Sequence, residues 1–272
     1  MADEAQLPVT SSEEPSWAPE ATECYQGVLR GLLAANVPIA VSGGFAFHHH
    51  TGIWRTTKDL DLVLPPGAVP RAFEVLVREG FETYVQDPVW LAKARRGEYF
   101  VDLITGVGNA TLTVEYSWIE RAVEDEVLGI RCKVLCVEEM IASKLFVTRR
   151  ERFDGADIAH LLRSRARNLD WERLRQLTKP HWQMLYWYLA LFAYIYPSQI
   201  TDVPRNIWRD LHNDFAESVT QPTTEQPFRG TLVDPKMFAI DVNEWGQRDT
   251  YRELWDNYPH PLEETNTTRS RE

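Results

Sequence analysis

The stretch VSGGFAFHHHTGIWRTTKDLDLVL, residues 41–64, decides how the rest of the chain is interpreted. It starts as an apolar strand, turns at Gly43 and Gly44, and continues as a short helix and a second strand with Asp59 and Asp61. Because glycines leave backbone N–H groups open at a helix start, the turn is suited to a phosphate. Two carboxylates on one strand face repel each other, and a divalent cation would neutralise them. A phosphate cradle beside an acidic metal site is what phosphoryl or nucleotidyl transfer requires.

The second strand is predicted to be amphipathic, because strand side chains alternate between the two faces of a sheet. One face would carry the polar side chains of Arg55, Thr57, Asp59 and Asp61. The other face would carry the apolar side chains of Leu60, Leu62 and Leu64.

The order of these residues, Ser42-Gly43-Gly44 and then Arg55-x-Thr57-x-Asp59-x-Asp61, resembles the nucleotidyltransferase superfamily with the DNA polymerase β-like fold. Within it, the nearest likeness is to the minimal and AbiEii-type nucleotidyltransferases, several of which are toxins or antitoxins. The resemblance implies Mg²⁺ or Mn²⁺ as cofactor and a nucleoside triphosphate such as ATP as substrate. It also implies a possible antitoxin partner.

A third carboxylate, Asp102, lies inside an apolar strand of a predicted hairpin whose arms are residues 90–95 and 99–105. A carboxylate in such a place costs free energy unless it is paired or bound to a metal. The resemblance gives Asp102 the role of third metal ligand. The alternative is that Asp102 pairs with a neighbouring arginine or caps the strand end.

From Val137 the pattern becomes helical, and Lys144 is followed by RRERFDGADIAHLL at residues 149–162. The order of Lys144, Asp154 and Asp157 resembles a further AbiEii-type pattern. A lysine on a helix is a good point charge for a triphosphate, and Asp157 could orient it or accept a proton from a hydroxyl. The alternative is that Asp154 caps the helix and Asp157 lies in its first turn, where the helix dipole favours it.

Taken together, the resemblance implies a role for each site residue. Asp59, Asp61 and Asp102 would hold the metal. The nucleotide would be bound by Ser42, Gly43, Gly44, Arg55, Thr57 and Lys144. Catalysis is assigned to the three aspartates with Lys144 and Asp157.

The chain has 272 residues and a formal net charge of −11, which argues against a protein that coats nucleic acid nonspecifically. An odd cysteine count of three suggests a reducing compartment, and we expect small core residues at Cys132 and Cys136. No secretory signal is evident, and the most apolar stretch, residues 184–196, is too short to span a bilayer. We therefore expect a cytoplasmic protein with no membrane partner.

The predicted fold class is α+β: a nucleotidyltransferase-like mixed sheet with flanking helices, then a helical lobe, with the cleft between them. The expected divisions are a disordered start (1–18), the sheet lobe (19–137), the helical lobe (138–220), a segment that packs back on the core (221–257) and a disordered tail (258–272). Three consecutive histidines, residues 48–50, point in different directions on a helix and are not expected to share one ion.

The predicted reaction moves a nucleoside monophosphate from the triphosphate to an acceptor hydroxyl on RNA, tRNA or protein, possibly in a toxin–antitoxin setting. Two rivals stay open: an antibiotic-type enzyme that modifies a small molecule, and a noncatalytic nucleotide-binding module that kept the fold. A local group of arginines could hold an RNA backbone, or could be a solvated helix face. This group consists of Arg149, Arg150, Arg152, Arg163, Arg165 and Arg167.

Overall fold

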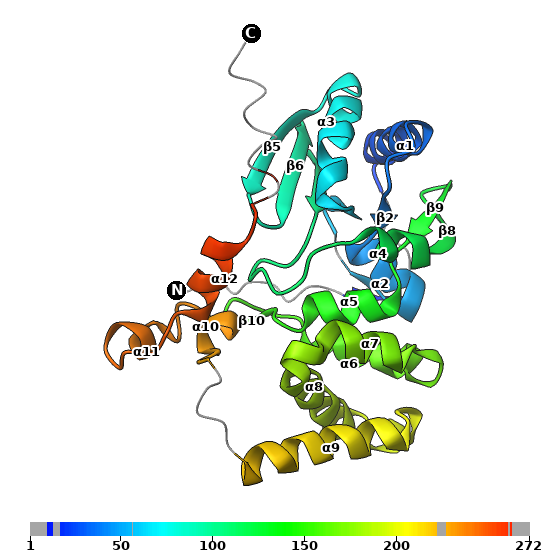
Figure 1. The fold of residues 1–272 in the computed structure, drawn as a ribbon. Coiled ribbons are helices and arrows are strands. Elements are labelled where there is room, and N and C mark those ends of the chain that lie inside the picture. The colour runs from blue at the N-terminus through cyan, green and yellow to red at the C-terminus, as the bar shows by residue number, and fades with distance from the viewer. Residues whose placement is uncertain (1–9, 13–16, 56, 222–226, 261, 263–272) are drawn as a thin grey trace, which may run out of the picture. The chain divides into compact units, whose positions relative to one another are not determined.

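The computed structural model describes residues 10–12, 17–55, 57–221, 227–260 and 262 (Figure 1). The chain divides into two compact units. The first, called the sheet unit, comprises residues 1–108, 113–136 and 259–272, and the second, called the helical unit, comprises residues 109–112 and 137–258. Each unit is described by itself.

The sheet unit contains α-helices α1 (Pro19–Ala34), α2 (Gly43–Thr51), α3 (Val69–Arg78) and α4 (Tyr116–Arg121), and a short 3-10 helix at Pro66–Ala68. Its strands are β1 (Thr10–Ser11), β2 (Ala40–Val41), β3 (Trp54–Arg55), β4 (Asp59–Val63), β5 (Glu82–Asp87), β6 (Leu91–Arg96), β7 (Tyr99–Ile104), β8 (Val123–Val127) and β9 (Ile130–Val134).

Seven of these nine described strands form a mixed sheet in the order β5-β6-β7-β4-β2-β9-β8. Strand β4 runs parallel to β7 and antiparallel to β2, so it lies inside the sheet. Its apolar residues Leu60 and Leu62 are fully buried, as are Val101 and Leu103 on β7. The period-two pattern of the sequence therefore sets which face of β4 packs into the core.

Residues 54–63 form two strands, which differs from the single strand expected from residue 55 onward. Trp54–Arg55 pair with Thr10–Ser11 as a separate two-stranded sheet, and β4 begins only at Asp59. Arg55 and Thr57 are therefore on no common strand with Asp59. The pairing of β1 also differs from the disorder expected for residues 1–18, of which 1–9 and 13–16 lie outside the described residues.

The helical unit contains α-helices α5 (Val137–Lys144), α6 (Gly155–Arg165), α7 (Trp171–Thr178), α8 (Trp182–Ile195), α9 (Arg205–Thr220), α10 (Gly230–Val233), α11 (Ala239–Asn243) and α12 (Thr250–Asn257). A hairpin joins α5 to α6 and consists of β10 (Thr148–Arg149) and β11 (Arg152–Phe153). Further 3-10 helices are Ala166–Asn168, Lys179–His181 and Pro197–Asp202. The core holds fully buried side chains from successive helices, including Ile141, Ile158, Leu174 and Leu189.

The segment after α9 makes defined contacts inside the helical unit. Leu232 is 3% exposed, and its carbonyl oxygen accepts a hydrogen bond from Asn109 Nδ2. Thr148 on β10 donates to the carbonyl oxygen of Val233 at 3.0 Å. Residues 222–226 of the segment expected to pack back on the core lie outside the described residues, as do residue 261 and residues 263–272 of the expected disordered tail.

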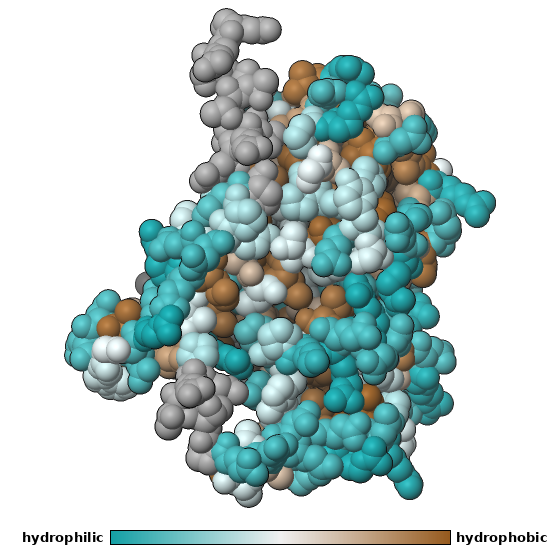
Figure 2. Space-filling model, viewed as in Figure 1, coloured by the Kyte–Doolittle hydropathy of each residue, from teal (hydrophilic) through white to brown (hydrophobic). Residues whose placement is uncertain are grey.

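The surface in view is mostly hydrophilic, and apolar residues are visible mainly between the polar ones (Figure 2). Among the described residues, no helix is both long enough and apolar enough to cross a membrane. All three cysteines are buried and free, as was expected for Cys132 and Cys136.

Candidate metal and nucleotide site

Three aspartates meet on one face of the sheet, and we call them the acidic face: Asp59, Asp61 and Asp102. Asp59 and Asp61 are two positions apart on β4, so their side chains point the same way. The parallel register of β4 and β7 pairs Asp61 directly with Asp102. The acidic face is thus produced by strand periodicity together with one non-local strand pairing.

The geometry of the acidic face suits a divalent cation. One carboxylate oxygen from each aspartate lies within 4.8 Å of the other two, and all three side chains are half-buried. Carboxylate oxygens are the ligands that Mg²⁺ and Mn²⁺ prefer. Three crowded carboxylates without a cation repel each other, so the donor set fits a metal ion that neutralises them.

A lysine that the sequence reasoning missed completes this row of side chains. Lys93 on β6 is paired in register with Asp102, and its Nζ donates to Asp102 Oδ1 at 2.7 Å and to Oδ2 at 3.0 Å. The alternative in which Asp102 pairs with a basic residue is observed, but with a lysine instead of the arginine that it named. The sequence carried only a partial signal for Lys93: the hairpin was predicted with residues 96–98 in its turn, whereas Arg96 pairs with Tyr99, and this register places Lys93 opposite Asp102.

Burial has the largest effect on the pKa of Asp102 and raises it above its ordinary value. The hydrogen bond and the charge of Lys93 lower the pKa but do not fully compensate, and Asp59 raises it further. A carboxylate in this position therefore costs free energy in the folded protein. Such a cost is typical of a functional site, where a bound cation restores the favourable balance.

The Gly-Gly turn lies directly against the acidic face. Gly43 has a φ of +57°, and a Cβ built on it would lie 1.8 Å from Asp61 Oδ2. A Cβ on Gly44 would lie 3.1 Å from Cβ of Thr57. Position 43 therefore requires glycine for two reasons, the left-handed backbone and the close approach of a carboxylate.

The turn also opens helix α2 toward the acidic face. Ser42 is the N-cap residue of α2, and its backbone N–H donates to the carbonyl oxygen of Asp61 at 2.9 Å. The side chain of Ser42 makes no capping hydrogen bond to this helix end. Its first N–H groups have no partner within the helix, which is the arrangement that binds phosphate oxygens.

The structure gives Arg55 and Thr57 different surroundings. The guanidinium of Arg55 lies over the ring of Phe47, 4.9 Å from its centroid. Thr57 Oγ1 donates to the carbonyl oxygen of Asp59 at 3.1 Å, and also lies 3.3 Å from Asp59 Oδ1. Thr57 therefore supports the start of β4 and orients the first carboxylate.

The three consecutive histidines have separate partners, as the helical geometry predicts. His48 stacks on Trp54 with ring centroids 4.0 Å apart, and His49 bonds the carboxylate of Asp125. His50 Nε2 lies 2.7 Å from the carbonyl oxygen of Leu135. These contacts attach α2 to its neighbours in the sheet unit.

In the helical unit, the second group of predicted residues forms a buried ionic cluster, called the Lys144 cluster. Lys144 Nζ donates to Asp154 Oδ2 at 2.5 Å and to Asp157 Oδ2 at 2.8 Å. Arg152 Nε donates to Asp154 Oδ1 at 3.1 Å. All three side chains of Lys144, Asp154 and Asp157 are at most 15% exposed.

Asp154 does not cap α6 with its side chain, so this part of the alternative is wrong. Asp154 occupies the N-cap position, but its carboxylate accepts no hydrogen bond from the helix end. Burial raises its pKa, while Lys144 and Arg152 outweigh that effect and hold the pKa below its ordinary value. Asp157 lies in the first turn of α6, as expected.

The group of arginines is partly neutralised within the helical unit. Arg167 donates to Asp202 Oδ1 at 2.8 Å, and Arg163 lies over the ring of Tyr196 at 5.8 Å from its centroid. Arg149 and Arg150 at the β10–β11 turn are exposed. Arg152, Arg163 and Arg167 are exposed as well, and Glu151 adds one negative charge at the turn.

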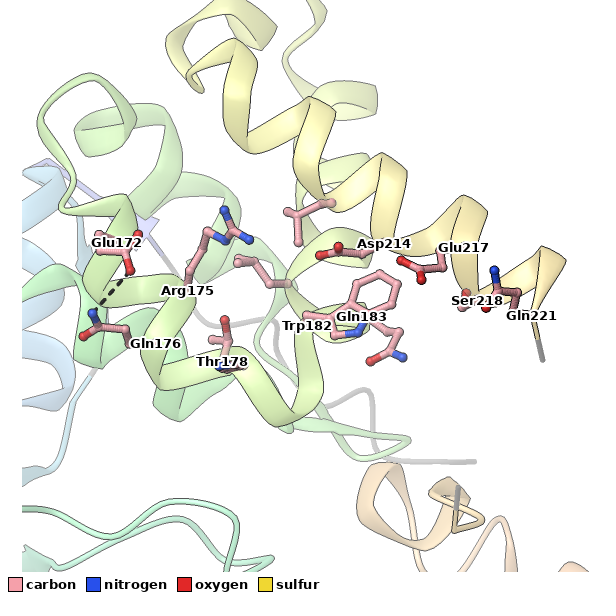
Figure 3. A pocket seen from close by; sticks show the side chains of 13 residues that line it. Glu172, Arg175, Gln176, Thr178, Trp182, Gln183, Asp214, Glu217, Ser218 and Gln221 are labelled. Atoms are coloured by element: carbon pink, nitrogen blue, oxygen red, sulfur yellow. Dashed lines mark hydrogen bonds between the residues drawn. The ribbon is translucent and has the colours of Figure 1, made fainter. Parts of the chain in front are cut away.

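The helical unit also has a groove of about 1090 Å³ between α7, α8 and α9. Figure 3 shows Trp182 lying between Gln183 and the carboxylates of Asp214 and Glu217 on α9. None of the site residues predicted from the sequence lines this groove.

Comparison with known proteins assigns the chain to a family. The family described as uncharacterised nucleotidyltransferase matches residues 26–196, more than half of the chain. This span contains the Gly-Gly turn, the acidic face and the Lys144 cluster. No curated protein matches the sequence.

Solved structures are similar to this chain only at low identity and low TM-score. ANT(2″)-Ia, in complex with adenylyl-2″-tobramycin, has 15% identity and a TM-score of 0.41, covering 58% of this chain and 95% of that one. An antigenic nucleotidyltransferase-like protein from Paracoccidioides brasiliensis has 19% identity and a TM-score of 0.40, covering 72% and 94%. JHP933 from Helicobacter pylori has 12% identity and a TM-score of 0.35, covering 93% and 96%.

The family match spans the residues that the sequence motif singled out and the mixed sheet that carries them. The chain therefore belongs to the uncharacterised nucleotidyltransferase family, and it is a nucleotidyltransferase with an α+β fold.

Proposed function

We propose that this enzyme transfers a nucleoside monophosphate from a nucleoside triphosphate to an acceptor hydroxyl, with a divalent cation held by the acidic face. The observation that supports this most is the convergence of three carboxylates within 4.8 Å beside a glycine turn. A bound Mg²⁺ or Mn²⁺ would neutralise triphosphate charge and favour ionisation of the attacking hydroxyl.

The residues of the sheet unit would bind and orient the triphosphate. The N–H groups at the start of α2 would donate to phosphate oxygens, since Ser42, Gly43 and Gly44 leave this helix end open. Arg55 would stabilise charge on the leaving group. Thr57 would keep Asp59 in the orientation required for a ligand, because it hydrogen-bonds that residue.

The proposed reaction forms one bond and breaks one. The acceptor oxygen bonds to the α-phosphorus while the bond between that phosphorus and the α–β bridging oxygen breaks. Pyrophosphate leaves with the bonding electron pair, and the acceptor proton passes to a base or to solvent.

The Lys144 cluster has a role of its own in this proposal. Asp154 and Asp157 hold the ammonium of Lys144 in one orientation, which supports a positioned phosphate ligand. The same contacts also suit a structural ion pair that stabilises the helical unit. A variant of Lys144 separates these two roles, as set out in the Discussion.

RNA is the acceptor class that one surface feature favours. Arg149 and Arg150 are exposed at a tight turn of a chain whose net charge is −11, so this turn is a local cationic surface. Backbone phosphates are bound by such local groups and lose affinity as salt rises. The AbiEii-type subgroup and an antitoxin partner rest on the sequence resemblance alone.

The experiment that tests the proposal offers each of the four α-³²P-labelled triphosphates with Mg²⁺ to three acceptor pools. These pools are total tRNA, cell protein, and a mixture of aminoglycosides and lincosamides. We expect label to enter tRNA with the parent enzyme and none to enter with Asp61→Asn. Label in the antibiotic pool alone would show that the acceptor is a small molecule and not RNA. No label in any pool would contradict the proposal.

A second experiment tests the cationic turn. Replacing Arg149 and Arg150 by Gln should weaken tRNA binding and flatten its dependence on salt, because two phosphate contacts are lost. The matched control replaces Arg248 and Arg252, which pair with acids of their own helix region. If the salt dependence of tRNA binding is unchanged in the Arg149 and Arg150 variant, this surface does not bind RNA.

A further inference from the structure

Lys93 has a position that no motif in the sequence indicated. It lies on β6, and the strand register places Asp61, Asp102 and Lys93 side by side across β4, β7 and β6. Lys93 and Asp102 are 21% and 13% exposed, so this ion pair is largely withdrawn from solvent. Exposed pairs contribute little to stability, whereas a pair shielded in this way has a larger effect on its surroundings.

The contact involves both oxygens of Asp102. Lys93 Nζ lies 2.7 Å from Oδ1 and 3.0 Å from Oδ2, so one ammonium uses acceptor sites on each oxygen. An ionised carboxylate has about four lone-pair sites, and a cation that took both oxygens would have to displace Lys93. As the contact stands, a cation can bind the remaining lone pairs of Asp102 but cannot take the bidentate position that Lys93 occupies.

The charges near the acidic face can be compared with the charge of one divalent cation. The three carboxylates carry three negative charges and Lys93 one positive charge, which leaves two negative charges. One divalent cation balances this sum. Without Lys93 the same face would attract a divalent cation more strongly and would be less stable without one.

We propose that Lys93 is the resident counter-cation of the acidic face, which holds Asp102 in the metal-free protein and competes with the divalent cation for that carboxylate. This inference rests on the proposed metal site. It makes Lys93 a positioning residue, since it acts through Asp102. The competition sets the affinity for the cation low enough that binding of the triphosphate, with its own negative charge, completes the site.

The experiment titrates Mn²⁺ into the full chain by calorimetry without nucleotide, and records melting with and without Mn²⁺. The variants are Lys93→Met, which keeps the length of the side chain and removes its charge, and Lys93→Arg, which keeps the charge. The control is Arg78→Met on α3, which removes a positive charge from an exposed site of the same unit.

For Lys93→Met we expect a lower melting temperature without Mn²⁺ and Mn²⁺ binding that is tighter by roughly fivefold or more, because one repelling charge is removed. Lys93→Arg should stay close to the parent, and Arg78→Met should change Mn²⁺ affinity by less than about twofold, because screening weakens a distant charge.

Each other outcome is decisive. If Lys93→Met melts lower but binds Mn²⁺ with equal or weaker affinity, Lys93 is a structural partner of Asp102 and the competition is refuted. If the parent binds no Mn²⁺ while Lys93→Met also binds none, the proposed metal site itself has failed. Binding to the parent that Lys93→Met leaves unchanged would refute the inference and leave the metal site standing.

Discussion

Gly43 and Asp61 approach so closely that a Cβ at position 43 would lie 1.8 Å from Asp61 Oδ2. The backbone of the glycine turn therefore packs directly against the Asp61 carboxylate on β4. The turn residue is fixed by this contact and by its φ of +57°, independently of any phosphate that the turn binds.

This contact predicts the effect of Gly43→Ala. The added Cβ would displace the Asp61 carboxylate and strain a left-handed backbone, which together should cost about 2–4 kcal/mol of unfolding free energy. Activity should fall more than stability accounts for. Gly67→Ala is the matched control, since its Cβ meets nothing within 4 Å and its φ is not positive. Equal unfolding midpoints in urea for the two variants would show that the close approach is not real.

The Lys144 cluster gives a second prediction. Lys144→Met leaves two largely buried carboxylates without their lysine, which should cost about 3–5 kcal/mol of unfolding free energy. The control Lys236→Met removes an exposed pair with Glu151 and should cost below about 1 kcal/mol. Triphosphate binding, measured by calorimetry at a temperature where both variants are folded, separates the two roles. Lost stability with unchanged binding would mean that Lys144 is structural only.

His181 gives a prediction for pH. Burial lowers the pKa of His181 to about 4, and the charge of Arg229 adds to this effect. Because the unfolded chain takes up the proton near pH 6.5, the folded state loses stability as pH falls from about 6.5 to about 4. Allowing for partial exposure, the loss should be about 1–2 kcal/mol.

The test replaces His181 by Gln, which cannot titrate in this range. Urea unfolding between pH 7 and pH 4 should show a shallower loss of stability for the variant than for the parent. The rings of Phe146 and His181 are perpendicular, with centroids 5.0 Å apart, so loss of this contact should add a constant offset between the two proteins at every pH. Parallel pH profiles would contradict the lowered pKa.

Local sequence patterns predicted much of the fold. Strand alternation placed Asp59 and Asp61 on one face, and the hairpin of β6 and β7 was expected, although Arg96 pairs with Tyr99 instead of lying in the turn. Strand β8 was missed, because its sequence VEDEV is largely charged and exposed and lacks the apolar alternation of a half-buried strand.

The details of the site depended on contacts that local patterns do not encode. The alignment of Asp61 with Asp102 follows from parallel pairing between segments about forty residues apart in sequence, which periodicity cannot set. The same applies to Asp154, where a lysine ten residues earlier displaces the expected helix cap. The resemblance suggested Asp102 as the third metal ligand, but its contact with Lys93 could be known only from the register of β6 and β7.

The central claim is that the acidic face binds a divalent cation, and thermal melting of the parent and Asp61→Asn tests it most directly. Asparagine keeps the shape of the side chain and removes one of three mutually repelling charges. Without metal, the variant should therefore melt at the same temperature as the parent or higher. Mg²⁺ with triphosphate should raise the melting temperature of the parent and raise that of the variant much less, because binding to the folded state alone stabilises it. A variant that melts lower without metal and responds to Mg²⁺ and triphosphate as the parent does would contradict the claim and assign Asp61 a structural role.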